Sequence, residues 1–311
     1  MKAERPEKLR RLITGGVFLR LVRGVLQGFT IILLVRVLST DEFGTYAYLI
    51  ALSQIISIPA QFGLPQLVVR DASPLAALGN GPALKALAQW ASRMVIITSA
   101  LGVFVGVCAI SLMDATVASV MSIALAMSLV PMAATTNLLS AQLRAMRVGL
   151  RSQTSEMVIA PTLFFGFVLA IYLIKIDGFA NVSGVLALRA VALLVSVLAV
   201  QWLLRRAFVS LKQRSSPKTV RPKEMSRKGL LKSSFVLGLS AGMFALNNQM
   251  DLMMVTNIQG VEHTAVYRVA ILMSFAVAVV AQSLVCDFGH DHFLRPRAGG
   301  NASASGGVFC H

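Results

Sequence analysis

The sequence predicts an all-α fold, a polytopic transmembrane bundle of about eight helical spans. The chain is 56% hydrophobic and 14% charged, whereas a typical soluble protein has about 25% charged residues. Its mean hydropathy is +0.73, and its apolar runs extend for roughly 20 residues, the length that crosses a bilayer as a helix. Within hydrocarbon, only helices and closed barrels satisfy every backbone polar group. Barrel strands would alternate apolar and polar residues, so these near-continuous runs indicate helices.

Each expected span is an apolar run bounded by polar connectors. The runs cover residues 12–38, 43–69, 91–113, 117–139, 157–174, 182–204, 229–255 and 265–285. We expect residues 1–204 to form a first transmembrane lobe and residues 229–286 to form part of a second lobe. The basic, proline-containing stretch 205–228 is typical of a cytoplasmic linker between them.

The C-terminal tail, residues 287–311, has neither apolar periodicity nor helix-capping signals. Two interpretations stay open: a disordered end, and translation out of frame after a lesion in the gene. A metal site within Cys286–His292 is less favoured, because the cysteines show no metal-site spacing. The sequence therefore predicts no metal site and no cofactor.

The basic residues account for a formal net charge of +16 and gather in alternate connectors. They lie mainly at 2–11, 70–93, 144–151 and 205–232, while the connectors between them carry Asp41, Glu42, Asp114, Asp177 and Glu262. Cytoplasmic loops are enriched in Lys and Arg, so we expect a multi-pass protein with a cytoplasmic N-terminus. Because the Lys and Arg residues lie mainly in the connectors between spans, we expect them to contact membrane lipids and not to bind nucleic acid.

Catalytic chemistry has little support in this sequence. It contains no hydrolase, kinase or phosphate-cradling motif, and no two carboxylates share a predicted helix face. His263 stands alone in an expected outer loop, where a histidine is usually solvated. We therefore expect the protein not to be an enzyme.

Charged side chains inside spans point to a binding cavity, because each costs about 2.5–3.5 kcal/mol to insert and usually faces a cavity or a partner. Arg20 and Arg23 share one face of the first span. The candidates on later spans are Arg189, Asn247, Asn248, Asp251 and Arg268. Snorkelling to the membrane surface is the alternative for the charged residues, and hydrogen bonding between helices is the alternative for the asparagines. Because most of these charges are cationic, we expect an anionic substrate.

Prolines lie inside three of the expected spans, as Pro59, Pro131 and Pro161. Each removes a backbone donor and kinks its helix. Kinked spans are common where helices surround a transport cavity, although inert bundles also tolerate them. The prolines therefore favour a cavity only modestly.

Two segments carry a family resemblance. The first reads Val35-Arg36-Val37-Leu38-Ser39-Thr40-Asp41-Glu42-Phe43-Gly44-Thr45-Tyr46 and is followed by Phe62-Gly63-Leu64-Pro65 and Arg70. The second, Asn247 to Tyr267, repeats an apolar helix, a short turn, a Glu and a Tyr that opens the next helix. Together they resemble the polysaccharide-biosynthesis flippases, the O-antigen and exopolysaccharide repeat-unit translocases of the multidrug/oligosaccharidyl-lipid/polysaccharide exporter superfamily.

The resemblance implies two helical lobes around a central cavity, with the second lobe C-terminally truncated in this chain. It implies transfer of an undecaprenyl-pyrophosphate-linked oligosaccharide across the bacterial inner membrane, for synthesis of lipopolysaccharide or exopolysaccharide. The implied partners are the lipid-linked oligosaccharide, a polysaccharide polymerase and the chain-length machinery. The implied ligands of the pyrophosphate or of acidic sugars are Arg20, Arg23, Arg189 and Arg268.

Other functions stay open beside this one. A cation-coupled drug exporter of the same superfamily would need carboxylates at membrane depth, which are nearly absent from the first lobe. A non-transporting subunit of a polysaccharide synthesis complex would need no cavity at all. A flippase that truncation has made inactive also stays open.

Overall fold

The computed structural model describes residues 4–112, 119–146, 158–174, 181–214, 227–271 and 274. Within this part of the chain the regular structure is helical, which confirms the predicted all-α bundle. The helices are α1 (Glu4–Val37), α2 (Thr40–Gln61), α3 (Leu64–Ala77), α4 (Gly81–Leu112), α5 (Val120–Ala145), α7 (Ala160–Ile174), α8 (Val182–Arg214) and α9 (Arg227–Gln259). Residues 261–271 form a further helix directly after α9.

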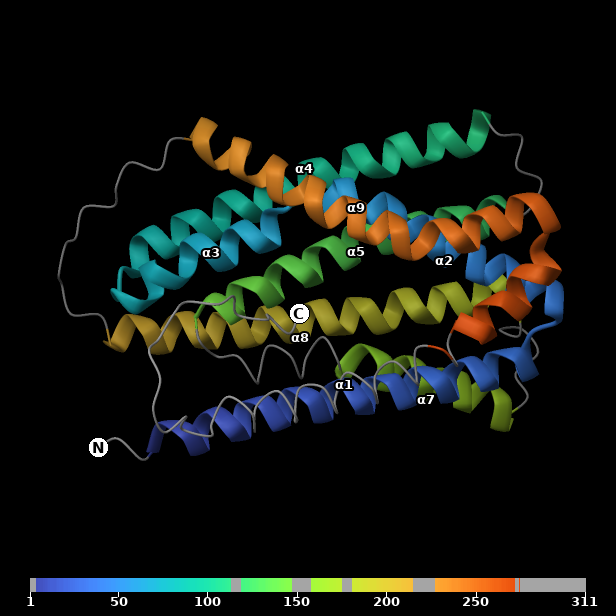
Figure 1. Cartoon of the computed structure of the whole chain (residues 1–311), viewed down its shortest axis with the longest axis horizontal. Helices are drawn as coiled ribbons and strands as arrows, with labels where there is room; N and C mark the ends of the chain where they lie inside the picture. The colour runs from blue at the N-terminus through green and yellow to red at the C-terminus, as the bar shows by residue number, and fades with distance from the viewer. Residues whose placement is uncertain are drawn as a thin grey trace, which may run out of the picture.

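The long helices run side by side along the longest axis of the molecule (Figure 1). Helix α5 lies at the centre, packed against α8, α4, α2 and α3. Helices α1 and α7 pack together on one side, and α9 crosses α2 on the opposite side (Figure 1). The start of α1, the α3–α4 connection and the end of α8 lie at one end of the bundle, and the α1–α2 connection lies at the other (Figure 1). The basic end of α8 and the acidic start of α2 therefore lie at opposite ends of the bundle, as the charge pattern predicts for these two segments.

Within the described ranges, four helices are long and apolar enough to cross a membrane, by length and composition. They are Thr40–Gln61, Gly81–Cys108, Val120–Ala145 and Val182–Val209, and shorter apolar helices cover Ala160–Ile174 and Gly229–Ser240. A polytopic membrane protein is thus supported, but the expected eight spans are not all recovered. Polar side chains lower the mean hydropathy of α1 and of the second half of α9. Most of the expected span 265–285 lies outside the described residues.

The run 43–69, expected as one span, is two helices, so this prediction is wrong. Pro59 lies in the last turns of α2, and Phe62 and Gly63 then adopt left-handed conformations with φ of 47° and 64°. Pro65 opens α3, a position where its missing N–H breaks no hydrogen bond. Two prolines that flank a left-handed pair therefore end one helix and begin the next.

Two other expected spans are only parts of longer helices. The run 91–113 belongs to α4, which already begins at Gly81, and the run 182–204 belongs to α8, which continues to Arg214. Hydropathy detects the part of a helix that suits hydrocarbon, whereas backbone hydrogen bonds continue through its polar end. The predicted linker and tail cannot be compared, because residues 215–226 and 287–311 lie outside the described part of the chain.

The turn between α1 and α2 is closed by a capping box. The backbone N–H of Glu42 donates to Ser39 Oγ at 3.3 Å, and the backbone N–H of Ser39 donates to Glu42 Oε2 at 3.1 Å. Both bonds satisfy donors that a helix start leaves free. The box fixes the beginning of α2, which places Phe43 and Tyr46 on the buried side of the helix.

Helix α9 crosses the break between α2 and α3 at a pair of glycines. A Cβ added to Gly63 would lie 2.3 Å from the backbone nitrogen of Gly238. Phe62 and Phe235 pack beside this point, with ring centroids 6.0 Å apart. Further along, Gln249 Nε2 donates to Gln54 Oε1 at 2.7 Å. Small residues let membrane helices approach closely enough for such contacts.

Gly63→Ala is expected to destabilise the protein by on the order of 1–3 kcal/mol, because the new methyl meets backbone and the left-handed φ strains alanine. Gly166→Ala, inside α7 with nothing within 4 Å of an added Cβ, is the control. Thermal unfolding in detergent would show a lower midpoint for Gly63→Ala alone. An unchanged midpoint would contradict the close crossing.

Candidate functional site

A cavity of about 220 Å³ lies between α1, α2, α5, α7, α8 and the helix 261–271. Its polar lining comprises Arg23, Gln27, Thr30, Tyr46, Thr136, Asn137, Arg189, Ser196 and Arg268. The predicted residues Arg23, Arg189 and Arg268 are far apart in sequence, and the fold brings them to this one space.

Arg189 is held in place inside the cavity. Its Nη1 donates to the Tyr46 hydroxyl at 2.6 Å, which joins α8 to α2. Its Cζ lies 5.3 Å from the centroid of the Phe164 ring on α7, within range of a cation–π contact. The guanidinium is therefore oriented by two helices before any ligand arrives.

Arg268 reaches the same cavity from the helix 261–271. It therefore shares this space with Arg189, and both side chains carry a positive charge. Arg23, on α1, also lines the cavity, and its side chain is exposed. Among the described residues that line this space there is no carboxylate to balance the three arginines.

The other predicted site residues lie elsewhere or cannot be placed. Asn247 and Asp251 are exposed on α9 and are not among the residues that line the cavity. The side chains of Arg20 and Asn248 lie outside the described part of the chain, although both residues belong to described helices. The structure thus gathers three of the arginines and leaves the α9 residues apart from them.

The arginines lie at two depths. Arg189 is seven residues from the start of α8 at Val182, about 10 Å at 1.5 Å per residue. Arg23 lies fourteen residues from the end of α1 at Val37, about 20 Å from the same end of the bundle. The cavity therefore offers positive charge near this end of the bundle and at a deeper level.

Neutral hydrogen-bonding groups line the deeper part of the cavity. Ser196 is fully buried, and its Oγ has no hydrogen-bond partner in the structure. Asn137 Nδ2 donates to Gln61 Oε1 at 3.2 Å, and the Thr136 hydroxyl donates to the carbonyl of Met132 at 2.8 Å. A hydroxyl-rich ligand could exchange hydrogen bonds with these groups.

Sequence analysis missed these neutral residues. The hydroxyls of Ser and Thr inside membrane helices usually donate to a carbonyl one turn earlier. The presence of these residues in a span therefore does not indicate a binding site. Gln27 could have been found, because it lies four residues after Arg23 on the same helix face. Tyr46 belongs to the segment that carried the family resemblance, but no role was assigned to it.

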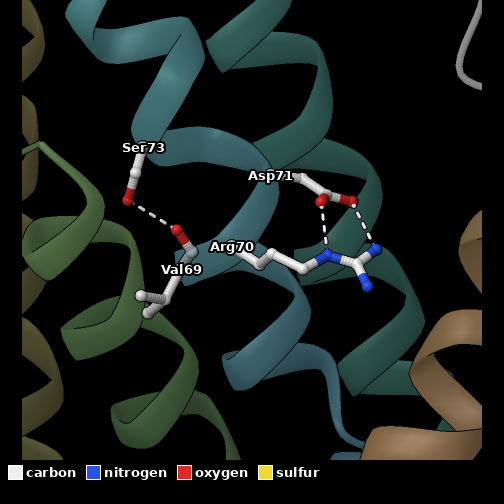
Figure 2. A network of polar contacts seen from close by, with 4 residues as sticks. All are labelled: Val69, Arg70, Asp71 and Ser73. Atoms are coloured by element: carbon white, nitrogen blue, oxygen red, sulfur yellow. Dashed lines mark hydrogen bonds and ion pairs between the residues drawn. The ribbon is translucent and has the colours of Figure 1, made fainter. Parts of the chain in front are cut away.

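Arg70, the other basic residue of that resemblance, is not part of the cavity lining. Figure 2 shows it on α3, paired with its neighbour Asp71 through Nε to Oδ1 at 2.7 Å and Nη2 to Oδ2 at 3.3 Å. This hydrogen bond raises the pKa of Arg70 above its ordinary value. The pair is exposed, and its charges balance, which distinguishes it from the uncompensated arginines of the cavity.

Comparisons with known proteins agree with this architecture. A family model described as polysaccharide biosynthesis protein matches residues 17–286. The match extends from α1 beyond the helix 261–271 and includes every cavity-lining residue. No curated protein and no solved structure matches the chain.

Cysteine labelling would test the cavity and its charge. In a background without native cysteines, Ser196→Cys is expected to react with a sulfonate-bearing methanethiosulfonate about tenfold faster than with a trimethylammonium analogue, after correction for a free thiol. Positive potential concentrates anions in clefts by factors of this order or more.

Ser140→Cys is the matched control, since Ser140 is equally buried on α5 but does not line the cavity. It should stay unlabelled in the folded protein. Equal rates for the two reagents at Ser196→Cys would contradict the positive potential of the cavity.

Proposed function

Because the chain belongs to the polysaccharide biosynthesis protein family, we propose that it moves an undecaprenyl-pyrophosphate-linked oligosaccharide across the bacterial inner membrane. The product would supply the synthesis of a surface polysaccharide. The membership and the apolar helices support a multi-pass membrane protein of polysaccharide synthesis. The flipping step and its substrate are our proposal.

The cluster of arginines without a carboxylate is the observation that carries this proposal. Unpaired charge in an apolar setting is costly, so three guanidiniums around one cavity favour an anionic occupant. Guanidinium groups bind phosphate oxygens through two parallel hydrogen bonds. A pyrophosphate group at the arginines would leave the attached sugars near the neutral groups of Thr136, Asn137 and Ser196.

A cation-coupled drug exporter fits this cavity less well. Such a protein needs carboxylates near its substrate, and the described lining of the cavity has none. A cationic drug would add to the repulsion among the arginines. Transport rather than catalysis is proposed, because the described lining contains binding groups and no nucleophile paired with a base.

The orientation of the chain follows from its charge. We propose that the start of α1 lies in the cytoplasm, together with the other basic ends of the bundle, since basic connectors stay on that side.

Reporter fusions would test this orientation. A periplasm-active reporter, such as a phosphatase, should be active when it is inserted at Asn181, before α8, and inactive when it replaces residues 215–226. The opposite pattern would exclude a cytoplasmic N-terminus.

Arg23→Gln is expected to lower translocation roughly tenfold or more, because a hydrogen bond to a charged group contributes about 1.5–3 kcal/mol. The assay follows a labelled lipid-linked oligosaccharide across the membrane of liposomes that contain the full chain. Arg36→Gln is the matched control, since Arg36 is exposed on the same helix and does not line the cavity.

The same pair of variants can be compared in cells that lack their own translocase. Surface glycan should fall with Arg23→Gln and persist with Arg36→Gln at equal protein levels. If both variants transport as well as the unchanged protein, Arg23 has no part in substrate binding. If the unchanged protein transports nothing, the proposed function is wrong.

A further inference from the structure

The two tryptophans of the chain lie at one level of the bundle. Trp202 is twenty residues from the start of α8 at Val182, about 30 Å at 1.5 Å per residue. Trp90 is twenty-two residues from the end of α4 at Leu112, about 33 Å, and these two helix ends lie at the same end of the bundle (Figure 1). The hydrocarbon core of a bilayer is about 30 Å thick, and tryptophan is enriched at its boundaries. Both rings therefore mark the membrane boundary nearer the basic end of α8.

An exposed apolar stripe on α8 leads to this boundary. Its side chains are spaced three or four residues apart along the helix, so they share one face. They are Val191, Leu194, Val195, Leu198 and Trp202. The stripe lies within a helix long and apolar enough to cross the membrane, so acyl chains of lipids are its natural neighbours.

Two arginines follow the stripe at the boundary. Arg205 and Arg206 lie three and four residues after Trp202, and both are exposed. The Cζ of Arg206 lies 3.5 Å from the centroid of the Trp202 ring, close enough for a cation–π contact. This contact holds the guanidinium of Arg206 at the level where lipid headgroups begin.

Acidic side chains are absent from the helices around this site. The described helices α4, α5 and α8 contain neither Asp nor Glu. Within the described part of the chain, neither Arg205 nor Arg206 takes part in an ion pair. The site therefore offers positive charge that an anionic partner would complement, next to an apolar surface.

We propose that this face of α8 binds an anionic glycerophospholipid, with its phosphate at Arg205 and Arg206 and an acyl chain along the apolar stripe. A guanidinium binds phosphate oxygens through two parallel hydrogen bonds, and anionic headgroups attract basic residues at the membrane surface. An acidic protein segment would match the charge but would leave the stripe uncovered. None of these residues lines the cavity, so the site is separate from the one proposed for the transported substrate.

The fluorescence of Trp202 reports on the lipid at this site. Trp90→Phe leaves Trp202 as the only tryptophan. The full chain is reconstituted in phosphatidylcholine vesicles that contain a minor fraction of phosphatidylglycerol with brominated acyl chains, which quench tryptophan on contact. Brominated phosphatidylcholine at the same fraction gives the reference, and unbrominated vesicles of each composition give the unquenched emission.

Quenching should indicate that phosphatidylglycerol is preferred over phosphatidylcholine by roughly tenfold or more. One basic residue near an anionic membrane surface contributes a factor of about five, and two arginines act here. Equal quenching by the two brominated lipids would overturn the proposal.

Variants at the arginines separate a headgroup site from simple exposure of Trp202 to lipid. Arg205→Gln and Arg206→Gln should each lower the preference about fivefold. Arg206→Lys should keep part of it, because lysine retains the charge without the fork of donors. An unchanged preference in the double variant Arg205→Gln, Arg206→Gln would overturn the proposal.

Arg93→Gln is the matched control. Arg93 is exposed on α4, nineteen residues from Leu112, about 28 Å and thus close to the same level. Its substitution removes the same charge and should leave the preference at Trp202 unchanged. A loss as large as that of Arg206→Gln would indicate a general effect of surface charge and would overturn a local site. Because quenching requires no transport, the outcome is independent of the proposed function.

Discussion

Hydrogen bonding inside hydrocarbon is the constraint on which the other features of this molecule depend. A backbone group without a partner is costly there, so long uninterrupted helices are the default, and every break needs compensation. The break after α2 illustrates this. The carbonyl of Ala60 is left free by the end of the helix, and the Thr98 hydroxyl of α4 donates to it at 2.6 Å. Nearby, Gln61 accepts a hydrogen bond from Asn137 of α5. Both contacts tie the broken helix to the centre of the bundle.

The cavity is one of the places where this constraint is left unsatisfied. Elsewhere in the described part of the bundle, most buried hydroxyls donate to a carbonyl within their own helix, as Ser53 does to Ile50 at 2.8 Å. In the cavity Ser196 has no such partner, as Ser140 and Ser234 have none elsewhere. No carboxylate among the described lining residues faces the arginines. A polar cavity with excess positive charge is therefore maintained by the packing of apolar helices around it, at a cost that a bound anion would offset.

Helix α9 is attached to the bundle through both small and large side chains. Helix α9 meets α2 and α3 at Gly63 and Gly238 and through a pair of glutamines. Phe235 packs on Phe62 at the same crossing, and Leu252 is almost fully buried. Two apolar clusters hold the helices together, one around α3, α4 and part of α5 and one around α1, α2 and α7. Leu230 of α9 belongs to the first cluster and Ala265 of the helix 261–271 to the second.

The sequence by itself determined the helical class, the approximate position of most apolar segments and the alternation of charged connectors. These properties are local, since hydropathy and charge are carried by each segment separately. The sequence also indicated which arginines lie inside predicted spans and are therefore candidates for a binding cavity. It did not reveal the end of α2 at Phe62 and Gly63, because an apolar composition continues across the break and only the backbone conformation shows it. Only the tertiary structure decided that Arg23, Arg189 and Arg268 share one cavity while Asn247 and Asp251 do not line it. The physical reason is that the rotation of each helix about its axis is set by packing against its neighbours, which no single segment encodes.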